Sequence, residues 1–134
     1  MTIARGIHVP LITPFTAGGT VAADALATLA HDVLAAGAAG IVALGTTGEP
    51  ATLTAAERRT VVDVCAGVAA DRGAALTIGA GSNDTRATAH ALAGLARWPS
   101  AAAALVPVPY STRPGEAGVL AHFAHVAPAS PGRV

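Results

Sequence analysis

The sequence contains no lysine, because all eight of its basic residues are arginines. Enzymes that form a Schiff base with a carbonyl substrate use a lysine amine as the nucleophile. The 134-residue chain therefore cannot perform that chemistry by itself. Coding bias is the simpler explanation of the same absence, because chains rich in alanine, glycine and arginine often carry arginine in place of surface lysine.

Charged residues are scarce as well, at 12% of the chain, and the formal net charge is zero. Binding to nucleic acid or to an anionic membrane needs a basic surface, so we expect neither partner. No apolar stretch approaches the ~20 residues of a membrane-spanning helix, and the start of the chain lacks the apolar region of a signal peptide. We expect a cytoplasmic protein whose partner is a small molecule or another protein.

Cysteine occurs once, which excludes an internal disulfide, and Cys65 falls in an apolar series with Val61 and Val68 that predicts a core position. His122 and His125 lie three apart on a predicted helix, but no carboxylate or thiolate beside them completes a metal site. We predict that both histidines lie on the helix surface, and we expect no metal and no cofactor.

Four continuous apolar runs, rich in β-branched residues, cover residues 7–13, 40–45, 75–80 and 103–108. Continuous runs are typical of strands buried on both faces in a parallel sheet. Helical periodicity predicts four helices between and after these runs. The first lies around residues 26–33 with Gly37 at its end, and the second starts from a capping box at Thr54. The third covers residues 84–97 and ends at Trp98-Pro99, and the fourth covers residues 115–127 with an inward side made of Val119, Leu120, Phe123 and Val126. The order is βα repeated four times.

Two architectures fit this order, an open doubly wound sheet or part of a (β/α)8 barrel. Polar residues follow each predicted strand, at Thr13, Thr46-Thr47, Ser82-Asn83 and Tyr110-Ser111. Barrel enzymes build their sites at the carboxyl ends of the strands, so this distribution favours the barrel. A complete barrel takes about 250 residues. We predict an α/β fold with parallel strands, in which residues 1–134 form a single truncated domain, the N-terminal half of a (β/α)8 barrel.

The stretch Gly45-Thr46-Thr47-Gly48-Glu49 follows the second apolar run. Two glycines allow a sharp turn, and the amides and hydroxyls of the threonines can converge on a carboxylate or phosphate. The local alternative is an ordinary turn that uses Gly and Thr for its geometry. No Gly-Lys-Ser/Thr follows, and Asp84 stands where a dinucleotide fingerprint has its third glycine, so neither nucleotide motif is complete.

The motifs VPLITPF, GTTGE with PATLTAAER, IGAGSNDT and VPVPYSTRPGEAGVLAHF occur in this order along the whole chain. Together they resemble the N-terminal half of the dihydrodipicolinate synthase and N-acetylneuraminate lyase family, pyruvate-dependent class I aldolases on a (β/α)8 barrel. The resemblance implies that Thr46 and Thr47 hold the carboxylate of pyruvate, with Gly48 at the binding site. It also implies that Thr46 and Tyr110 belong to a catalytic proton relay, and that an aldehyde is the second substrate.

Several positions depart from the family pattern. The family's Schiff-base lysine lies on the sixth strand, and this chain stops at SPGRV, where the fifth strand is expected. Ser111 stands where the synthases have a second tyrosine that reaches a neighbouring subunit. Ala87 replaces the glutamate of lysine-regulated synthases, so we expect no feedback inhibition by lysine. The isolated chain is therefore expected to be inactive.

Other readings of the sequence stay open. The chain is alternatively a sibling 2-keto-acid aldolase or dehydratase, a non-catalytic half-barrel that binds small anions or assembles with a partner, or an unrelated α/β nucleotide-binding domain. Glu49 is either a general base or a residue that fixes the loop through hydrogen bonds. Because a half-barrel leaves its first and fourth strands with free apolar edges, we expect a homo-oligomer or a self-associating half-barrel.

Overall fold

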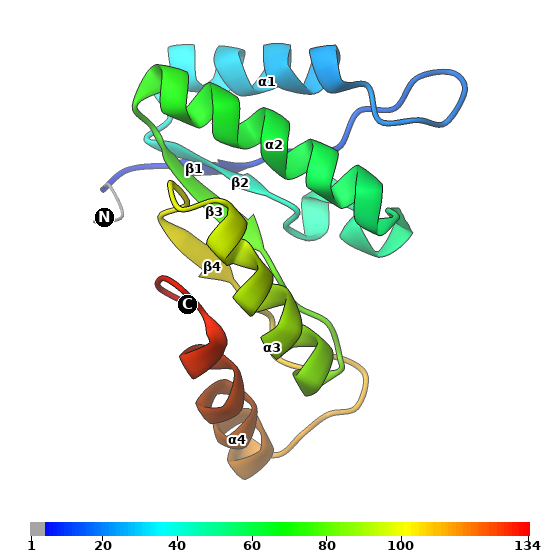
Figure 1. The fold of residues 1–134 in the computed structure, drawn as a ribbon, viewed down its shortest axis with the longest axis vertical. Coiled ribbons are helices and arrows are strands. Elements are labelled where there is room, and N and C mark those ends of the chain that lie inside the picture. The colour runs from blue at the N-terminus through cyan, green and yellow to red at the C-terminus, as the bar shows by residue number, and fades with distance from the viewer. Residues whose placement is uncertain (1–4) are drawn as a thin grey trace.

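The computed structural model describes residues 5–134, so the first four residues, which belong to the segment examined for a signal peptide, lie outside the described residues. It contains four strands, four α-helices and short 3-10 turns (Figure 1). The strands are β1 (His8–Pro10), β2 (Gly40–Ala43), β3 (Ala75–Gly79) and β4 (Ala103–Leu105). The helices are α1 (Ala23–Ala35), α2 (Ala55–Arg72), α3 (Thr85–Gly94) and α4 (Glu116–Val126). The predicted βα order is confirmed.

The four strands form one parallel sheet in the order β1-β2-β3-β4. Right-handed crossovers between sequential parallel strands place every helix on the same face of the sheet. Accordingly α2 packs against β2 and β3, and α1 packs against α2 and β2. The opposite face carries a register row of Pro10, Val42, Thr77 and Ala103. This arrangement is half of a (β/α)8 barrel, as the sequence predicts.

The strands are shorter than the apolar runs that predicted them, for local reasons. After β4 come Pro107 and Pro109, and proline has no N–H to continue a ladder. After β2, Leu44 has a φ of 57°, which turns the chain out of the strand. The edge of β4 is also not free, because Arg133 forms a parallel bridge with Ala103 and its carbonyl accepts a 2.7 Å hydrogen bond from the amide of Ala104. An isolated bridge therefore covers part of the outer edge of β4.

The helix ends follow their sequence signals. Thr54 and Glu57 form the predicted capping box, since Thr54 Oγ1 accepts from the amide of Glu57 at 3.3 Å and Glu57 Oε2 accepts from the amide of Thr54 at 2.8 Å. Gly37 has a φ of 102° and follows Ala36 at the end of α1. The last turn of the predicted third helix is a 3-10 turn, Leu95–Arg97, which Trp98 ends.

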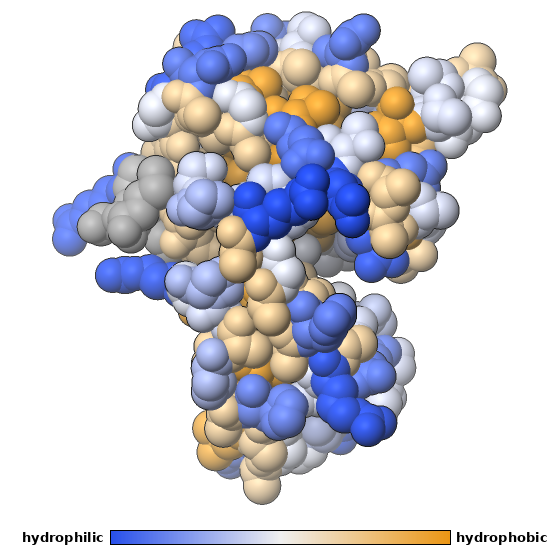
Figure 2. All heavy atoms as spheres, in the orientation of Figure 1, coloured by the Kyte–Doolittle hydropathy of each residue, from blue (hydrophilic) through white to orange (hydrophobic). Residues whose placement is uncertain are grey.

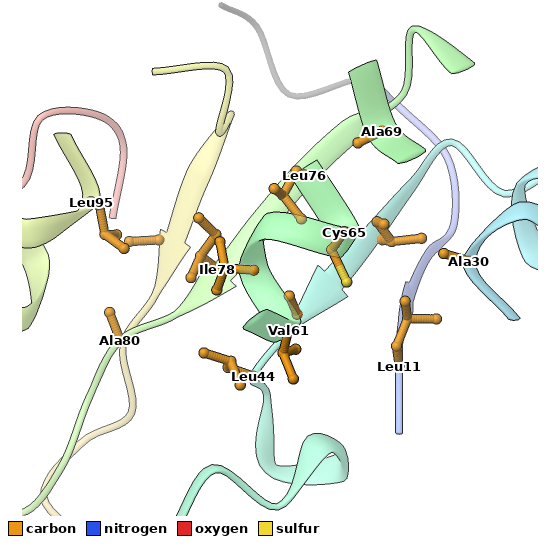
Figure 3. Packing of buried hydrophobic residues seen from close by; sticks show 14 of the residues in the cluster. Leu11, Ala30, Leu44, Val61, Cys65, Ala69, Leu76, Ile78, Ala80 and Leu95 are labelled. Carbon is orange, nitrogen blue, oxygen red and sulfur yellow. The ribbon is translucent and has the colours of Figure 1, made fainter. Parts of the chain in front are cut away.

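The hydrophobic core lies between the helices and the sheet. Figure 3 shows Val61 and Cys65 of α2 among the strand-side residues Leu11, Leu76 and Ile78. Cys65 is fully buried, as predicted, and burial raises the pKa of its thiol to about 12. Such a thiol stays protonated at neutral pH, so Cys65 acts as a packing residue.

The prediction for α4 is wrong for Leu120, whereas Phe123 and Val126 pack against the core as predicted. Leu120 is 65% exposed, whereas His122 is only 3% exposed. The inward stripe runs through the half-buried Val119 and the buried His122 and Val126, at the i, i+3 and i+7 positions that share one helix face. Leu120 lies two positions from His122 and falls on the outer side. The stripe therefore includes a histidine, which a search for apolar residues passes over.

The helices pack in two pairs, α1 with α2 and α3 with α4. Across the gap between the pairs, Nε1 of Trp98, after the Leu95–Arg97 turn, donates a 2.7 Å hydrogen bond to Oδ1 of Asp63 on α2. In Figure 2 the surface narrows between the part that carries α1 and α2 and the part that carries α3 and α4. The two pairs are joined mainly through the sheet.

Candidate functional site

The loop after β2 is a compact turn between two left-handed residues. Leu44 and Glu49 have φ values of 57° and 52°, and residues Thr46–Gly48 between them form a 3-10 turn. Within the turn, the amides of Gly48 and Glu49 donate to the carbonyls of Gly45 and Thr46 at 2.9 and 3.2 Å. Residues with a Cβ seldom adopt positive φ, and such residues cluster at functional sites.

Thr46 and Thr47 are exposed at the tip of this turn. Within residues 5–134, neither their hydroxyls nor their amides make a hydrogen bond to another group of the chain. Two hydroxyls and two amides are thus available to a small anion at one corner of the molecule. An anion held there would receive charge-assisted hydrogen bonds, which are stronger than those to a neutral acceptor.

Gly48 differs from the two threonines because it is buried. Its carbonyl oxygen accepts a 2.7 Å hydrogen bond from the hydroxyl of Thr13, which is itself buried. Thr13 follows β1, the strand next to β2, so this bond fixes the turn to the neighbouring strand end. The structure therefore places the three predicted residues in one turn, with Gly48 on its anchored side.

Tyr110 lies in the loop after β4 and is 55% exposed. It lines a cavity of about 790 Å³ that also includes Thr46 and Glu49 and that extends to Arg58 and Trp98. Thr47 and Gly48 are not part of the lining of this cavity. The two residues predicted for the relay therefore share one cavity, whereas those predicted for substrate binding lie beside it.

Glu49 stabilises the loop through its backbone. Its carbonyl oxygen accepts from the amide and the hydroxyl of Thr52, at 3.0 and 2.9 Å. Its side chain is exposed and makes no hydrogen bond to any other described residue. The expectation that Glu49 fixes the loop is met by main-chain atoms.

The loop after β3 is held by side chains of the following helix. Asp84 caps α3, because its Oδ1 accepts from the amides of Arg86 and Ala87 at 2.9 and 3.1 Å. These bonds lower the pKa of the Asp84 carboxyl, and the bond from the amide of Ala87 has the larger effect. The buried hydroxyl of Thr88 accepts from the amide of Ser82 at 3.1 Å. The loop that follows β3 is therefore ordered up to the start of α3.

The two histidines of α4 do not lie together on the surface, which corrects the prediction. His122 is buried, and its Nδ1 lies 2.9 Å from the hydroxyl of Thr85 at the start of α3, whereas His125 is exposed. His122 Nε2 is buried without a partner among the described residues. Residues 5–134 contain no group of three potential metal ligands. The Thr85–His122 contact ties α3 to α4.

Two features of the site were missed in the sequence. The sequence shows Thr13 only as a polar residue at a strand end, and its hydrogen bond to Gly48 depends on the parallel register of β1 and β2. The positive φ of Leu44 has no sequence signal, since glycine and asparagine are the usual residues in that conformation.

Among the described helices, none has the length and hydropathy needed to cross a membrane.

Comparison with known proteins agrees with this architecture. The model of the dihydrodipicolinate synthetase family matches residues 3–133. The chain is 42% identical to 4-hydroxy-tetrahydrodipicolinate synthase of Rhizobium meliloti (strain 1021) over 123 residues, which are 92% of this chain and 41% of that protein. It is 44% identical to the synthase of Agrobacterium fabrum (strain C58) over 125 residues, which are 93% of this chain and 42% of the relative.

Solved structures show the same relationship. Dihydrodipicolinate synthase from Aquifex aeolicus superposes with a TM-score of 0.86 at 36% identity, covering 96% of this chain and 43% of that one. YagE, a prophage protein of the dihydrodipicolinic acid synthase family from E. coli K12 solved in complex with pyruvate, has a TM-score of 0.83 at 31% identity and covers 95% and 42%. The chain spans about two fifths of the length of these relatives. On its sequence and its fold, this chain belongs to the dihydrodipicolinate synthetase family.

Proposed function

We propose that this chain supplies the carboxylate-binding part of a pyruvate-dependent class I aldolase site. The observation that carries the proposal is the turn at Thr46–Gly48, in which the hydroxyls and amides of Thr46 and Thr47 have no partner among the described residues. In this proposal the carboxylate of pyruvate accepts hydrogen bonds from Thr47 and from the adjacent amides. Family membership and the pyruvate complex of YagE support the choice of ligand.

The relay is proposed to run through Thr46 and Tyr110. Both residues line the same cavity, which leaves room for a second, aldehyde substrate beside the turn. A hydroxyl and a phenol can each accept and donate a proton, so they can pass a proton between the reacting atoms and solvent. Ser111, which follows Tyr110, is proposed to take no part.

The Schiff-base lysine has to come from outside these 134 residues, because the sequence has none. We propose that residues 1–134 are one truncated barrel domain, inactive alone, that works with the remaining strands in cytoplasmic lysine biosynthesis. No cofactor, nucleic acid or membrane enters this scheme. The lack of lysine also favours a second candidate function, in which a homo-oligomeric half-barrel binds small anions without catalysis.

A trapping experiment separates the two functions. The chain is mixed with the C-terminal three fifths of the Rhizobium meliloti relative, incubated with pyruvate and borohydride, and analysed by mass spectrometry. We expect an adduct on a lysine of the added part only when this chain is present, and less adduct with Thr47→Val. Trapping that is independent of this chain, or unchanged by Thr47→Val, contradicts the proposed site.

A further inference from the structure

The turn that carries Thr46 and Thr47 starts from a backbone conformation that a neighbouring strand has to accommodate. Leu44 is buried and has a φ of 57°, a region that residues with a Cβ disfavour. The last register pair of β2 and β3 joins Ala43 to Ile78. Beyond this pair the chain leaves the strand at Leu44, beside Gly79, the final residue of β3.

The carbonyl group of Leu44 occupies the space that a side chain at position 79 would take. A Cβ built on Gly79 would lie 1.9 Å from the carbonyl oxygen of Leu44 and 2.5 Å from its carbonyl carbon. It would also lie 3.0 Å from the amide nitrogen of Gly45. All three are backbone atoms of the turn, so no side-chain rotation can relieve the overlap.

We propose that Gly79 is a positioning residue of the carboxylate site, a role that rests on the proposed function. The missing side chain at position 79 lets the backbone of β3 approach the turn and allows Leu44 to keep its left-handed conformation. That conformation sets the direction in which the amides and hydroxyls of Thr46 and Thr47 leave the strand. On the other side, the hydrogen bond from Thr13 to Gly48 holds the end of the same turn.

The test uses the full chain and its Gly79→Ala variant. Hydrogen exchange followed by mass spectrometry reports on the turn, because the amides of Gly48 and Glu49 are hydrogen-bonded within it. Gly67→Ala is the matched control, since a Cβ at this exposed position of α2 meets nothing within 4 Å. We expect exchange in residues 44–53 to become roughly tenfold faster in Gly79→Ala, with α1 and α2 as protected as in the parent. We expect Gly67→Ala to match the parent in residues 44–53, while α2 itself exchanges no faster, because alanine is the better helix former.

Pyruvate titration then tests the link to function. Pyruvate is expected to slow exchange in residues 44–53 of the parent and of Gly67→Ala, and to act on Gly79→Ala with about tenfold weaker affinity. Parent-like exchange and affinity in Gly79→Ala would overturn the positioning role. If pyruvate does not change exchange in the parent, the proposed function is contradicted. The exchange rates measured without pyruvate then still test the positioning role of Gly79.

A second measurement covers the case in which Gly79→Ala does not fold. The φ of Leu44 is then determined in the parent chain from NMR scalar couplings. A positive value supports the close approach of Leu44 to Gly79. A negative value removes the reason for a glycine at position 79 and overturns the proposal.

Discussion

The hydroxyl of Thr13 donates a 2.7 Å hydrogen bond to the carbonyl oxygen of Gly48, which lies 35 residues further along the chain. Both residues are buried, and each lies in the segment that follows a strand, Thr13 after β1 and Gly48 in the turn after β2. The bond joins two neighbouring strand ends at the site, so the geometry of the turn depends on the pairing of β1 with β2.

Removal of this hydroxyl should destabilise the protein. Thr13→Val keeps the shape of the side chain but leaves the buried carbonyl of Gly48 without its donor, which costs about 1–3 kcal/mol. We expect a lower midpoint of urea unfolding for Thr13→Val. Thr13→Ser keeps a hydroxyl and serves as the control, and equal midpoints for Thr13→Val and the parent would show that the bond contributes nothing.

Cys65 should be unreactive in the folded protein. Burial raises the pKa of its thiol to about 12, so the nucleophilic thiolate is almost absent at pH 8. We expect rapid alkylation by iodoacetamide in denaturant, and in water only slow alkylation at a rate limited by unfolding. Rapid alkylation of the native chain, monitored by mass spectrometry, would contradict the buried position.

Asp84 should make stability depend on pH in acid. Hydrogen bonds from Ala87 and Arg86 lower the pKa of its carboxyl in the folded state. Its contribution is therefore full above the unfolded pKa of about 4 and is lost as the pH falls through the lower folded value. We expect urea midpoints of the parent to fall more steeply than those of Asp84→Asn below about pH 4. Parallel curves would exclude a role for the charge.

The chain should self-associate. Ile12, two residues after β1, and Leu105, the last residue of β4, are 53% and 48% exposed, and β1 is an edge strand of the sheet that residues 5–134 form. Apolar strand edges without charges tend to pair with another chain. We expect sedimentation to show oligomers at micromolar concentration and Ile12→Asp to shift them towards monomers. Leu120→Asp, on the outside of α4, is the control, and a monomeric parent would be the contrary outcome.

The two threonines should contribute differently once the barrel is completed with the C-terminal part of a relative. Thr47→Val removes a hydrogen bond to a charged group, worth about 1.5–3 kcal/mol, and should weaken pyruvate binding. Thr46→Val should lower turnover more than binding, because proton relays contribute about 10²–10⁴-fold. Ser111→Ala should leave turnover nearly unchanged. Steady-state kinetics and pyruvate titration check these effects. Threonine variants that bind pyruvate and turn over like the parent would show that the loop is only a structural turn.

The sequence predicts those features that depend on neighbours along the chain. The capping box of Thr54 and Glu57 is encoded within four residues, and Thr46 and Thr47 are adjacent in any fold. The βα order follows from the apolar runs, because parallel strands need buried faces and crossover helices. These parts require no knowledge of which strands pair.

The features that the sequence did not predict depend on tertiary register. The Thr13–Gly48 bond and the contact between Leu44 and Gly79 join residues whose strands must first align. The sequence does not predict the buried position of His122, because its partner Thr85 lies 37 residues away in the chain. A lone histidine in a helical pattern carries no signal for such a partner.

The pairing of the helices has a consequence for local unfolding. Within residues 5–134, α1 packs with α2 and α3 packs with α4, while the Trp98–Asp63 hydrogen bond bridges the two pairs. Opening between the two pairs would have to break the pairing of β2 with β3, the packing of α2 on β3 and this one hydrogen bond. The cavity that contains Thr46 and Tyr110 is lined by residues of both pairs, among them Arg58 of α2 and Ala87 of α3, so opening between the pairs would widen it.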